Sequence, residues 1–413
     1  MQDTFFTEFE KRGYFNQCTE KTALTELMSQ NKIKAYIGFD CTAPSLHVGS
    51  LMQIMCLRLL QKYGHQPIVL LGGGTTLIGD PSGKEETRKI LDKKEIQKNI
   101  KSIENVFKIF LKTTNPKTKP IFVNNYSWLS KLNYINFLRE IGRHFTINKM
   151  LTFDSVKIRL EREQSLSYME FNYMMLQAFD FYELSKRYKC ILQIGGSDQW
   201  GNIVNGTDLI KRKIKKQTYG LTTPLITMSS GAKMGKTEKG AIWLNKKMLS
   251  PYDYWQFWRN TEDKDVINFL KFFTDLPCEE IDKFKNQNNN INKLKILLAN
   301  ETTTLLHGSG AAKDSEITAQ KTFGEKSIGK SLPTIKIKKN LVLEGITILD
   351  LVILSKLANS KSEVRRMIKN NGIRLNNKIL TDDKIIINKN DIDENNNIKV
   401  SHGKKNHVIL KII

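Results

Sequence analysis

The sequence predicts an α/β fold whose first and largest domain is a Rossmann-like parallel sheet. Short runs of almost continuous apolar residues, such as 67–71 and 190–194, are typical of strands buried on both faces. Stretches with helical spacing, such as 94–110 and 168–182, lie between such runs. Strands that alternate with helices favour βαβ units and therefore a parallel sheet.

The expected elements of this domain follow one another along the chain. We expect strands at 35–40, 67–71, 121–123 and 190–194, and helices at 51–63, 94–110 and 168–182. Glycines follow the strands at 67–71 and 190–194, which places loops at the carboxyl ends of both. Open α/β sheets bind their ligands at this edge.

The rest of the chain divides by composition. Ser250 and Pro251 form a helix start, and the pattern stays helical to about residue 313. Gly, Lys and Ser, together with Pro333, then indicate a linker. We therefore expect a Rossmann-like domain at 1–247, a small α-helical domain at 248–323, a linker at 324–344 and a small α/β domain at 345–413.

The charge of the chain indicates a polyanionic partner. The 413 residues include 65 Lys and Arg against 42 Asp and Glu, a net charge of +23. RNA, DNA and an anionic membrane all fit such a balance. The charge is concentrated, because residues 211–247 hold 10 basic side chains against one acidic side chain.

Several classes of protein are disfavoured. No apolar run approaches the length of a membrane span, so we expect no membrane association. The first residues resemble no secretory signal, which favours a cytoplasmic protein. The 5 cysteines are widely spaced and include no CxxC pair, so we expect reduced thiols and no bound structural metal.

The first chemical motif is the segment 41–50, between an expected strand and an expected helix. A helix N-terminus offers unpaired N–H groups and the positive end of a dipole, which suit a phosphate. Gly49 lets a nucleotide lie close to the backbone, and His47 can hydrogen-bond phosphate oxygens. A capping turn with an incidental histidine is the alternative.

The second motif is the glycine-rich segment 231–237. Lys233 and Lys236 lie three residues apart in it, next to Thr237. Such a cationic loop can surround a polyphosphate and stabilise its charge during a reaction. Taken alone, a solvated basic loop is the simpler interpretation.

The two motifs together resemble the HIGH and KMSKS signatures of class I aminoacyl-tRNA synthetases. Further motifs resemble bacterial-type tyrosyl-tRNA synthetases in particular. They are Tyr36-Ile37-Gly38-Phe39-Asp40, the glycines 72–74 with Ile78-Gly79-Asp80-Pro81-Ser82-Gly83-Lys84, Tyr173 with Gln177 and Asp180, and Gly195-Gly196-Ser197-Asp198-Gln199-Trp200-Gly201-Asn202. The similarity runs in order over nearly the whole chain.

The resemblance implies a role for each matching residue. The catalytic set would be His47, Lys84, Arg88, Lys233, Lys236 and Thr237. The tyrosine site would be Tyr36 and Asp180 at the phenol, Tyr173 and Gln177 at the ammonium with Asp80 near it, and Gln199 near the carboxylate. The ATP site would be Asp40, Thr42, Gly49, Ser50, Gly196, Asp198 and Lys236. The family usually has His or Asn where this chain has Ser50, whose shorter side chain puts that contact in doubt.

The resemblance also implies the reaction. The carboxylate of L-tyrosine attacks the α-phosphorus of ATP, which Mg²⁺ accompanies, and the resulting tyrosyl-adenylate acylates the terminal ribose of tRNA(Tyr). Positioning and charge stabilisation are sufficient for such a step, with no protein nucleophile. Buried polar groups aimed at the phenol would reject phenylalanine, which leaves them unpaired.

The C-terminal segment resembles a small RNA-binding domain shared with a ribosomal protein and pseudouridine synthases. Arg365, Arg366 and Lys369 occupy one helical turn and are the expected contacts to tRNA phosphates, although a solvated helix face remains the alternative. The family forms homodimers, and residues 126–165 would hold the interface. From the sequence alone, the aromatic residues of this segment (Tyr126, Trp128, Phe137 and Phe145) fit a core equally well.

Three other functions remain to be weighed. A tryptophanyl relative shares the fold and the motifs, but the pair of Tyr36 and Asp180 argues against it. A nucleotidyltransferase with an HxGH-type motif would lack the distal lysine loop. A non-catalytic RNA-binding protein would not be expected to keep so many charged site residues intact.

Overall fold

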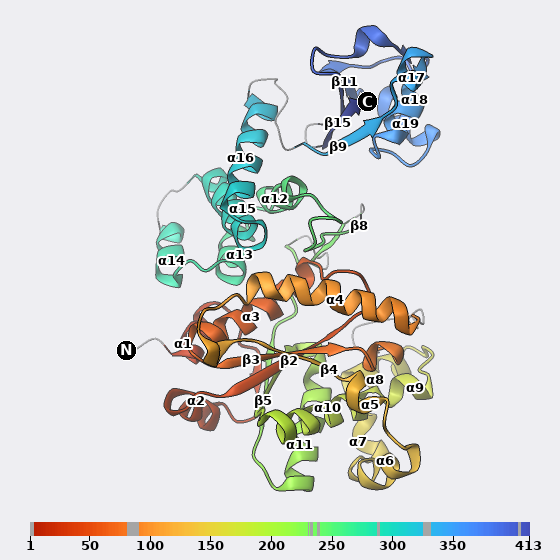
Figure 1. The fold of residues 1–413 in the computed structure, drawn as a ribbon. Coiled ribbons are helices and arrows are strands. Elements are labelled where there is room, and N and C mark those ends of the chain that lie inside the picture. Colours follow the sequence, from red (N-terminus) through yellow and green to blue (C-terminus); the bar gives the residue numbers. More distant parts are fainter. Residues whose placement is uncertain are drawn as a thin grey trace. The chain divides into compact units, whose positions relative to one another are not determined.

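The computed structural model describes residues 4–80, 91–229, 231, 234–237, 240–286, 290–324, 332–403 and 406–413. The chain forms two compact units (Figure 1). The first comprises Met1–Met248 with Thr261–Leu298, and the second comprises Leu249–Asn260 with Ala299–Ile413. Each unit is described by itself.

The first unit is built on a six-stranded sheet with the order β1-β6-β5-β2-β3-β4. The strands are β1 (Gln17–Cys18), β2 (Lys34–Asp40), β3 (Gln66–Gly72), β4 (Ile121–Asn124), β5 (Leu192–Gly196) and β6 (Tyr219–Thr223). All neighbours are parallel except β1, which pairs antiparallel with β6 at the edge. The predicted α/β fold with a parallel sheet is therefore confirmed.

The direction of the sheet reverses at β2. The chain adds β3 and then β4 on one side of β2, and later adds β5 and β6 on the other side. β2 pairs with β3 along its whole length but with β5 only at Ala35–Leu192 and Tyr36–Gln193. β2 and β5 are therefore not hydrogen-bonded to each other beyond Tyr36 and Gln193. Ligands of open α/β sheets bind at such a reversal, outside the carboxyl ends of the strands.

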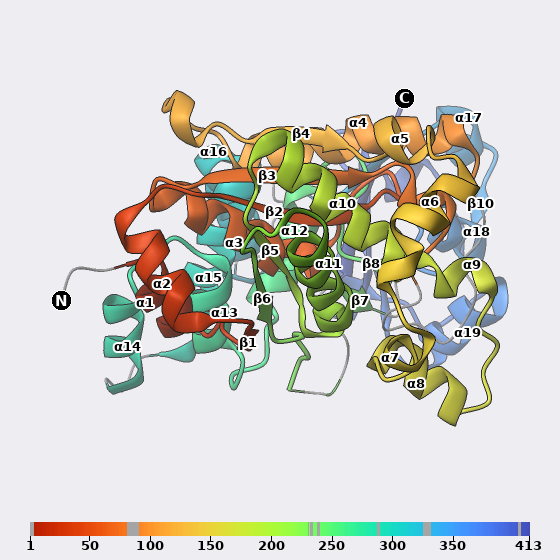
Figure 2. The same ribbon diagram turned by 90° about the horizontal axis from the view of Figure 1, so that it is seen from below.

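Helices cover both faces of this sheet. α3 (Leu51–Lys62) and α4 (Lys93–Phe110) lie on one face, and α10 (Tyr173–Tyr188) and α11 (Trp200–Ile214) lie on the other (Figure 2). The other helices of this unit are α1 (Phe5–Lys11), α2 (Lys21–Gln30), α5 (Tyr126–Leu129), α6 (Tyr134–Glu140), α7 (Ile147–Met150), α8 (Asp154–Glu161), α9 (Tyr168–Phe171), α13 (Val266–Phe273) and α14 (Cys278–Asn286), with α15 (Ile291–His307) shared between the units. The helix expected at 168–182 is two helices, because the chain turns at Asn172 between α9 and α10.

The face under α10 carries a continuous hydrophobic core. Tyr36 of β2 packs on Phe181 of α10, with the ring centroids 5.2 Å apart. Trp128 and Phe137 belong to the same core, and they are 4% and 8% exposed. These two aromatic side chains are thus buried within one chain.

The second unit contains helices and a small sheet domain. The helices are α12 (Pro251–Arg259), α16 (Ser309–Gly324), α17 (Lys339–Leu343), α18 (Ile348–Leu354) and α19 (Lys361–Lys369). The five-stranded sheet has the order β12 (Lys378–Ile379), β11 (Ile373–Leu375), β14 (Asn397–His402), β15 (Asn406–Ile412) and β9 (Thr334–Ile337), and β10 (Ile346–Thr347) pairs with β13 (Ile386–Ile387).

Part of the stretch expected as a linker is structured. Residues 334–337 form β9, which pairs in parallel with β15, and α17 follows directly. The alternation of Thr, Ile, Lys and Ile directs Ile337 into the core of the small domain. The nearby Pro333 and the high content of Lys obscured this strand signal.

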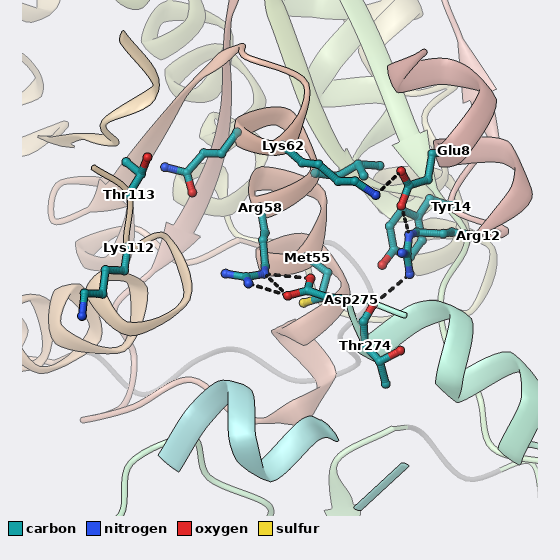
Figure 3. Close-up of a pocket in the computed structure, with 12 residues that line it drawn as sticks. Glu8, Arg12, Tyr14, Met55, Arg58, Lys62, Lys112, Thr113, Thr274 and Asp275 are labelled. Carbon is teal, nitrogen blue, oxygen red and sulfur yellow. Dashed lines mark hydrogen bonds and ion pairs between the residues drawn. The ribbon is translucent and has the colours of Figure 1, made fainter. Parts of the chain in front are cut away.

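A buried ion pair fixes the N-terminal helix of the first unit (Figure 3). Arg12 donates to Oε1 of Glu8 at 2.7 Å and to the backbone oxygens of Lys271, Thr274 and Leu276 at 2.8–3.0 Å. The second oxygen of Glu8 accepts from Lys62 and Tyr63. The side chains of Glu8 and Arg12 are only 9% and 4% exposed, so the charge of each is neutralised away from water mainly by the other.

We expect Arg12→Met to lower the free energy of unfolding of this unit by about 3 kcal/mol, because it leaves Glu8 buried without its guanidinium. Urea titration followed by tryptophan fluorescence measures the change. Lys11→Met is the matched control, since Lys11 pairs with Glu279 on the surface and should cost less than about 1 kcal/mol. Equal losses in the two variants would contradict the assignment.

Candidate active site

A cavity of about 330 Å³ opens at the carboxyl ends of β2, β3 and β5, where the sheet reverses. Eleven of the residues predicted for the tyrosine and ATP sites line it. They are Tyr36, Asp40, Gly49, Ser50, Asp80, Tyr173, Gln177, Asp180, Gly196, Asp198 and Gln199. The structure thus brings together residues that lie up to 163 positions apart, Tyr36 to Gln199.

A buried carboxylate, Asp180 of α10, lines this cavity. Asn125 and Trp128 donate to its two oxygens at 2.8 and 2.7 Å. Burial raises the pKa of Asp180 to about 7, although the hydrogen bonds from Asn125 and Trp128 act in the opposite direction. The carboxyl group therefore changes its charge near neutral pH.

The hydroxyl group of Tyr36 lies in the same part of the cavity lining. It is buried and has no hydrogen-bond partner among the residues that the structure describes. Burial, and to a smaller extent the charge of Asp180, raise the pKa of Tyr36 well above its usual range, so the phenol stays neutral. A buried hydroxyl without a partner is costly, and a ligand that supplies the missing partner would remove that cost.

A chain of hydrogen bonds leads from this carboxylate to the end of β2. The side-chain amide of Asn125 donates to Asp180 and also approaches the Thr75 hydroxyl at 3.1 Å. Thr75 donates to Asp40 at 3.1 Å, and the Tyr173 hydroxyl approaches the same oxygen at 3.3 Å. The predicted residues Asp40 and Tyr173 are thus linked to each other and, through Thr75 and Asn125, to Asp180.

A second polar cluster joins η5 (Ser197–Gln199), α10 and α11. Asn202 donates to Gln177 at 3.0 Å and to Gln199 at 3.1 Å, and Gln199 donates to Asp80 at 3.0 Å. Each amide is therefore oriented by its neighbour. The sequence motifs placed Gln177, Gln199 and Asp80 in the site, and the structure adds Asn202 behind them.

Close approach explains two of the glycines around the cavity. A methyl group built on Gly72 would lie 2.7 Å from Oδ1 of Asp40, and one built on Gly196 would lie 2.5 Å from Oδ1 of Asp198. Both contacts are too short for a carbon atom. Larger residues here would displace the carboxylates that line the site.

The motif at 41–50 forms a loop and the short helix η1 (Val48–Ser50), which leads into α3. Nδ1 of His47 accepts from the backbone N–H of Gly49 at 3.0 Å, so one ring nitrogen holds the turn. Gly49 and Ser50 line the cavity, whereas Thr42 and His47 are outside its described lining, and Thr42 is exposed. One part of the loop therefore lines the cavity, and the other part does not.

The second motif lies against the first. The backbone N–H of Val48 donates to Ile242 at 2.9 Å, and that of Leu244 donates to Leu46 at 2.9 Å. His47 and Trp243 therefore lie opposite each other as an antiparallel backbone pair. A methyl group built on Gly49 would lie 2.8 Å from the backbone oxygen of Met234. The two segments adjoin although 187 positions separate His47 from Met234 along the chain.

Several predicted catalytic side chains are not described by the structure. Lys84, Arg88 and Lys233 lie outside the described residues. For Lys236 and Thr237 the backbone is described as β7 (Lys236–Thr237), which pairs with β8 (Gly240–Ala241). Their roles stay predictions.

The predicted RNA contacts lie on α19 of the second unit. Arg365, Arg366 and Lys369 are all exposed, while Val364 and Ile368 on the other side of the helix are buried. Arg365 pairs with Asp383 at 3.0 Å. The helix thus presents a basic surface to solvent.

Two further properties concern the described part of the chain. It contains no group of three His, Cys, Asp or Glu side chains that could hold a metal ion. No helix within it has the length and apolar character needed to cross a bilayer.

The cavity in Figure 3, about 400 Å³, is lined by charged groups that pair with one another, such as Arg58 with Asp275.

Sequence comparisons agree with this geometry. The family model described as tRNA synthetases class I (W and Y) matches residues 28–324, and the model described as Tyrosine–tRNA ligase SYY-like C-terminal domain matches residues 325–410. A tyrosine–tRNA ligase of Pelagibacter ubique is 64% identical over 409 residues, which cover 99% of both chains. One of Rickettsia rickettsii is 51% identical over 409 residues, which cover 99% of this chain and all of its own.

A solved structure is also similar. The C-terminally truncated mitochondrial tyrosyl-tRNA synthetase of Aspergillus nidulans superimposes with a TM-score of 0.70 at 30% sequence identity, and the match covers 78% of this chain and 95% of that one. The resemblance inferred from the motifs is therefore confirmed. The chain belongs to the class I tRNA synthetases (W and Y).

Proposed function

We propose that the chain is a tyrosine–tRNA ligase. It activates L-tyrosine with ATP to tyrosyl-adenylate, releases pyrophosphate, and transfers tyrosine to the 3′-terminal adenosine of tRNA(Tyr). The observation that carries this proposal is the pair of polar groups in the cavity lining, the buried carboxylate of Asp180 and the unpartnered hydroxyl of Tyr36.

These two groups match a phenol better than other aromatic side chains. A phenol hydroxyl both donates and accepts a hydrogen bond, whereas an indole N–H only donates and a phenyl ring does neither. Ionised Asp180 can accept a further hydrogen bond besides those from Asn125 and Trp128. The Tyr36 hydroxyl needs an acceptor. Tyrosine satisfies both groups, tryptophan would leave Tyr36 without an acceptor, and phenylalanine would offer a partner to neither group.

The rest of the cavity suits the reacting end of the substrates. Gln177 and Gln199, fixed by Asn202, lie where the ammonium and carboxylate groups of tyrosine would be held, with Asp80 beside them. Gly196 and Asp198 would contact the ATP ribose. Asp40, Thr42, Gly49 and Ser50 complete the proposed nucleotide site.

Charge stabilisation drives the first step in this proposal. The tyrosine carboxylate is already ionised and attacks the α-phosphorus, while pyrophosphate leaves with its Mg²⁺ and carries the displaced charge. No protein base is needed, so catalysis depends on alignment and on cations at the transferring group. We assign this role to His47, Lys84, Arg88, Lys233, Lys236 and Thr237.

The proposal extends to the partners of the enzyme. Arg365, Arg366 and Lys369 would hold tRNA phosphates, and the enzyme would be cytoplasmic. A homodimer would cover an apolar groove of about 430 Å³ in the first unit, whose lining includes Leu77, Leu132, Tyr134 and Tyr168. Tyr134 and Tyr168 are 56% and 66% exposed, and a second copy would remove such apolar surface from water.

The function is tested by amino-acid-dependent exchange of pyrophosphate into ATP. We expect exchange with tyrosine and little with tryptophan or phenylalanine.

Tyr36→Phe should raise the KM for tyrosine about fivefold, the worth of one neutral hydrogen bond, without lowering the melting temperature, because the lost hydroxyl had no partner. Tyr254→Phe, which removes a buried tyrosine hydroxyl that is not part of the cavity lining, is the control and should leave the KM unchanged. Exchange that depends on tryptophan instead of tyrosine would refute the proposal.

The raised pKa of Asp180 predicts how tyrosine binding depends on pH. Below about pH 7 the carboxyl group is protonated, and the phenol then loses a charged acceptor, which makes stronger hydrogen bonds than a neutral one. Affinity for tyrosine should therefore fall as the pH decreases from 8 to 6, by at most about tenfold per pH unit. Equilibrium dialysis of wild type and Asp180→Asn checks this, and a pH dependence that persists in the variant would contradict it.

Lys236→Ala should slow adenylate formation on the order of 10²–10³-fold, because one charged contact to the transition state is lost. Tyrosine affinity should change little. Stopped-flow fluorescence separates the two quantities. Lys246→Ala, which removes a nearby exposed lysine outside the motif, should behave as wild type; an equal effect in both would show a nonspecific influence of charge.

A further inference from the structure

Ser229, in the segment between β6 and the second motif, is held by two carboxylates. Its backbone N–H and its hydroxyl both lie 3.0 Å from Oδ2 of Asp265, and the hydroxyl also lies 2.6 Å from Oε2 of Glu262. The single hydroxyl proton is thus shared between two acceptors. Hydrogen bonds to charged groups are stronger than neutral ones, so this contact is a firm attachment point.

Asp265 occupies a position where its side chain would ordinarily serve its own helix. It directly precedes α13 as the N-cap residue, and an aspartate there usually accepts from a backbone N–H of the first turn. Its carboxylate makes no such cap and instead binds Ser229, 36 residues away. Asp265 is 8% exposed. A side chain that gives up the usual N-cap hydrogen bond for a contact with a distant segment indicates that the distant contact serves function.

The backbone beyond Ser229 continues to the nucleotide end of the proposed site. Gly231 donates to the backbone oxygen of Met228 at 2.8 Å, and Ile242 donates to that of Gly235 at 3.1 Å. Met234 is 5% exposed, and its backbone oxygen faces Gly49. The attachment at Ser229 and the pairing with the first motif therefore hold the described part of this segment from both sides.

We propose that Ser229 and Asp265 are positioning residues for adenylate formation. Their hydrogen bonds fix the start of the segment that lies against His47 and Gly49, and so set the place of the second motif beside the nucleotide. This inference rests on the proposed function. Neither residue is part of the described cavity lining, so their loss should affect the rate of activation and leave the binding of tyrosine intact.

The test compares Ser229→Ala and Asp265→Ala with two matched variants. Ser229→Thr keeps the hydroxyl, and Asp263→Ala removes an exposed carboxylate two residues before Asp265 that pairs with Lys295. In stopped-flow experiments Ser229→Ala and Asp265→Ala should each slow adenylate formation about ten- to a hundredfold. The Kd for tyrosine should change less than twofold in both. The two matched variants should keep the wild-type rate. Combining the two alanine changes should cost less than the product of their separate effects, because both changes remove the hydrogen bond between the Ser229 hydroxyl and Asp265.

Hydrogen–deuterium exchange provides a readout that does not depend on activity. The Ser229 amide should exchange faster in Asp265→Ala and remain protected in Asp263→Ala. Unchanged rates and unchanged exchange in both alanine variants would overturn the inference, as would an equal loss of rate in Ser229→Thr. If wild type showed no tyrosine-dependent activation, the proposed function would fail, while amide exchange would still decide whether Asp265 holds Ser229.

Discussion

The site depends on the separation of two neighbouring strands. β2 and β5 pair at Tyr36 and Gln193 and not beyond. From that point both strands end in residues that line the cavity, Asp40 on one and Gly196 on the other. A parallel sheet that reverses its order leaves this edge open, since the connections leave the two strands in opposite directions. The cavity is thus a consequence of topology, and the side chains give it its chemistry.

Within that cavity, the cost of burying the carboxylate of Asp180 decides which ligand is favoured. An ionised carboxylate away from water is costly unless it is paired or hydrogen-bonded. Asn125 and Trp128 offset part of this cost at Asp180, and the raised pKa shows that the remainder is substantial. A third donor from a phenol would lower the cost further. The burial that makes the charge of Asp180 costly would therefore favour a substrate that carries a phenol hydroxyl.

The sequence predicts the fold and most of the cavity because its signals are local. The apolar run at 67–71 falls within β3, and the run at 190–194 overlaps β5, which begins two residues later at Leu192. The spacing of Tyr173, Gln177 and Asp180 correctly places them on one helix. Asn125 and Trp128 were not predicted as partners of Asp180, since their role comes from a distant segment that folds under α10. Asn and Trp are also ordinary core and turn residues, so no local pattern distinguishes them. The strand β9 was missed for a similar reason, because its partner β15 lies at the other end of the domain.

The two motifs illustrate how distant segments make one site. Backbone hydrogen bonds tie residues 46–48 to 242–244, and these bonds do not depend on side-chain identity. Glycine is nevertheless required where the segments are closest: at Gly235, φ is +83° and an added methyl group would lie 2.9 Å from the backbone nitrogen of Gly49. A larger residue at either glycine would force the segments apart. The glycines of the two motifs therefore serve the packing of one motif on the other, in addition to any contact that they make with a nucleotide.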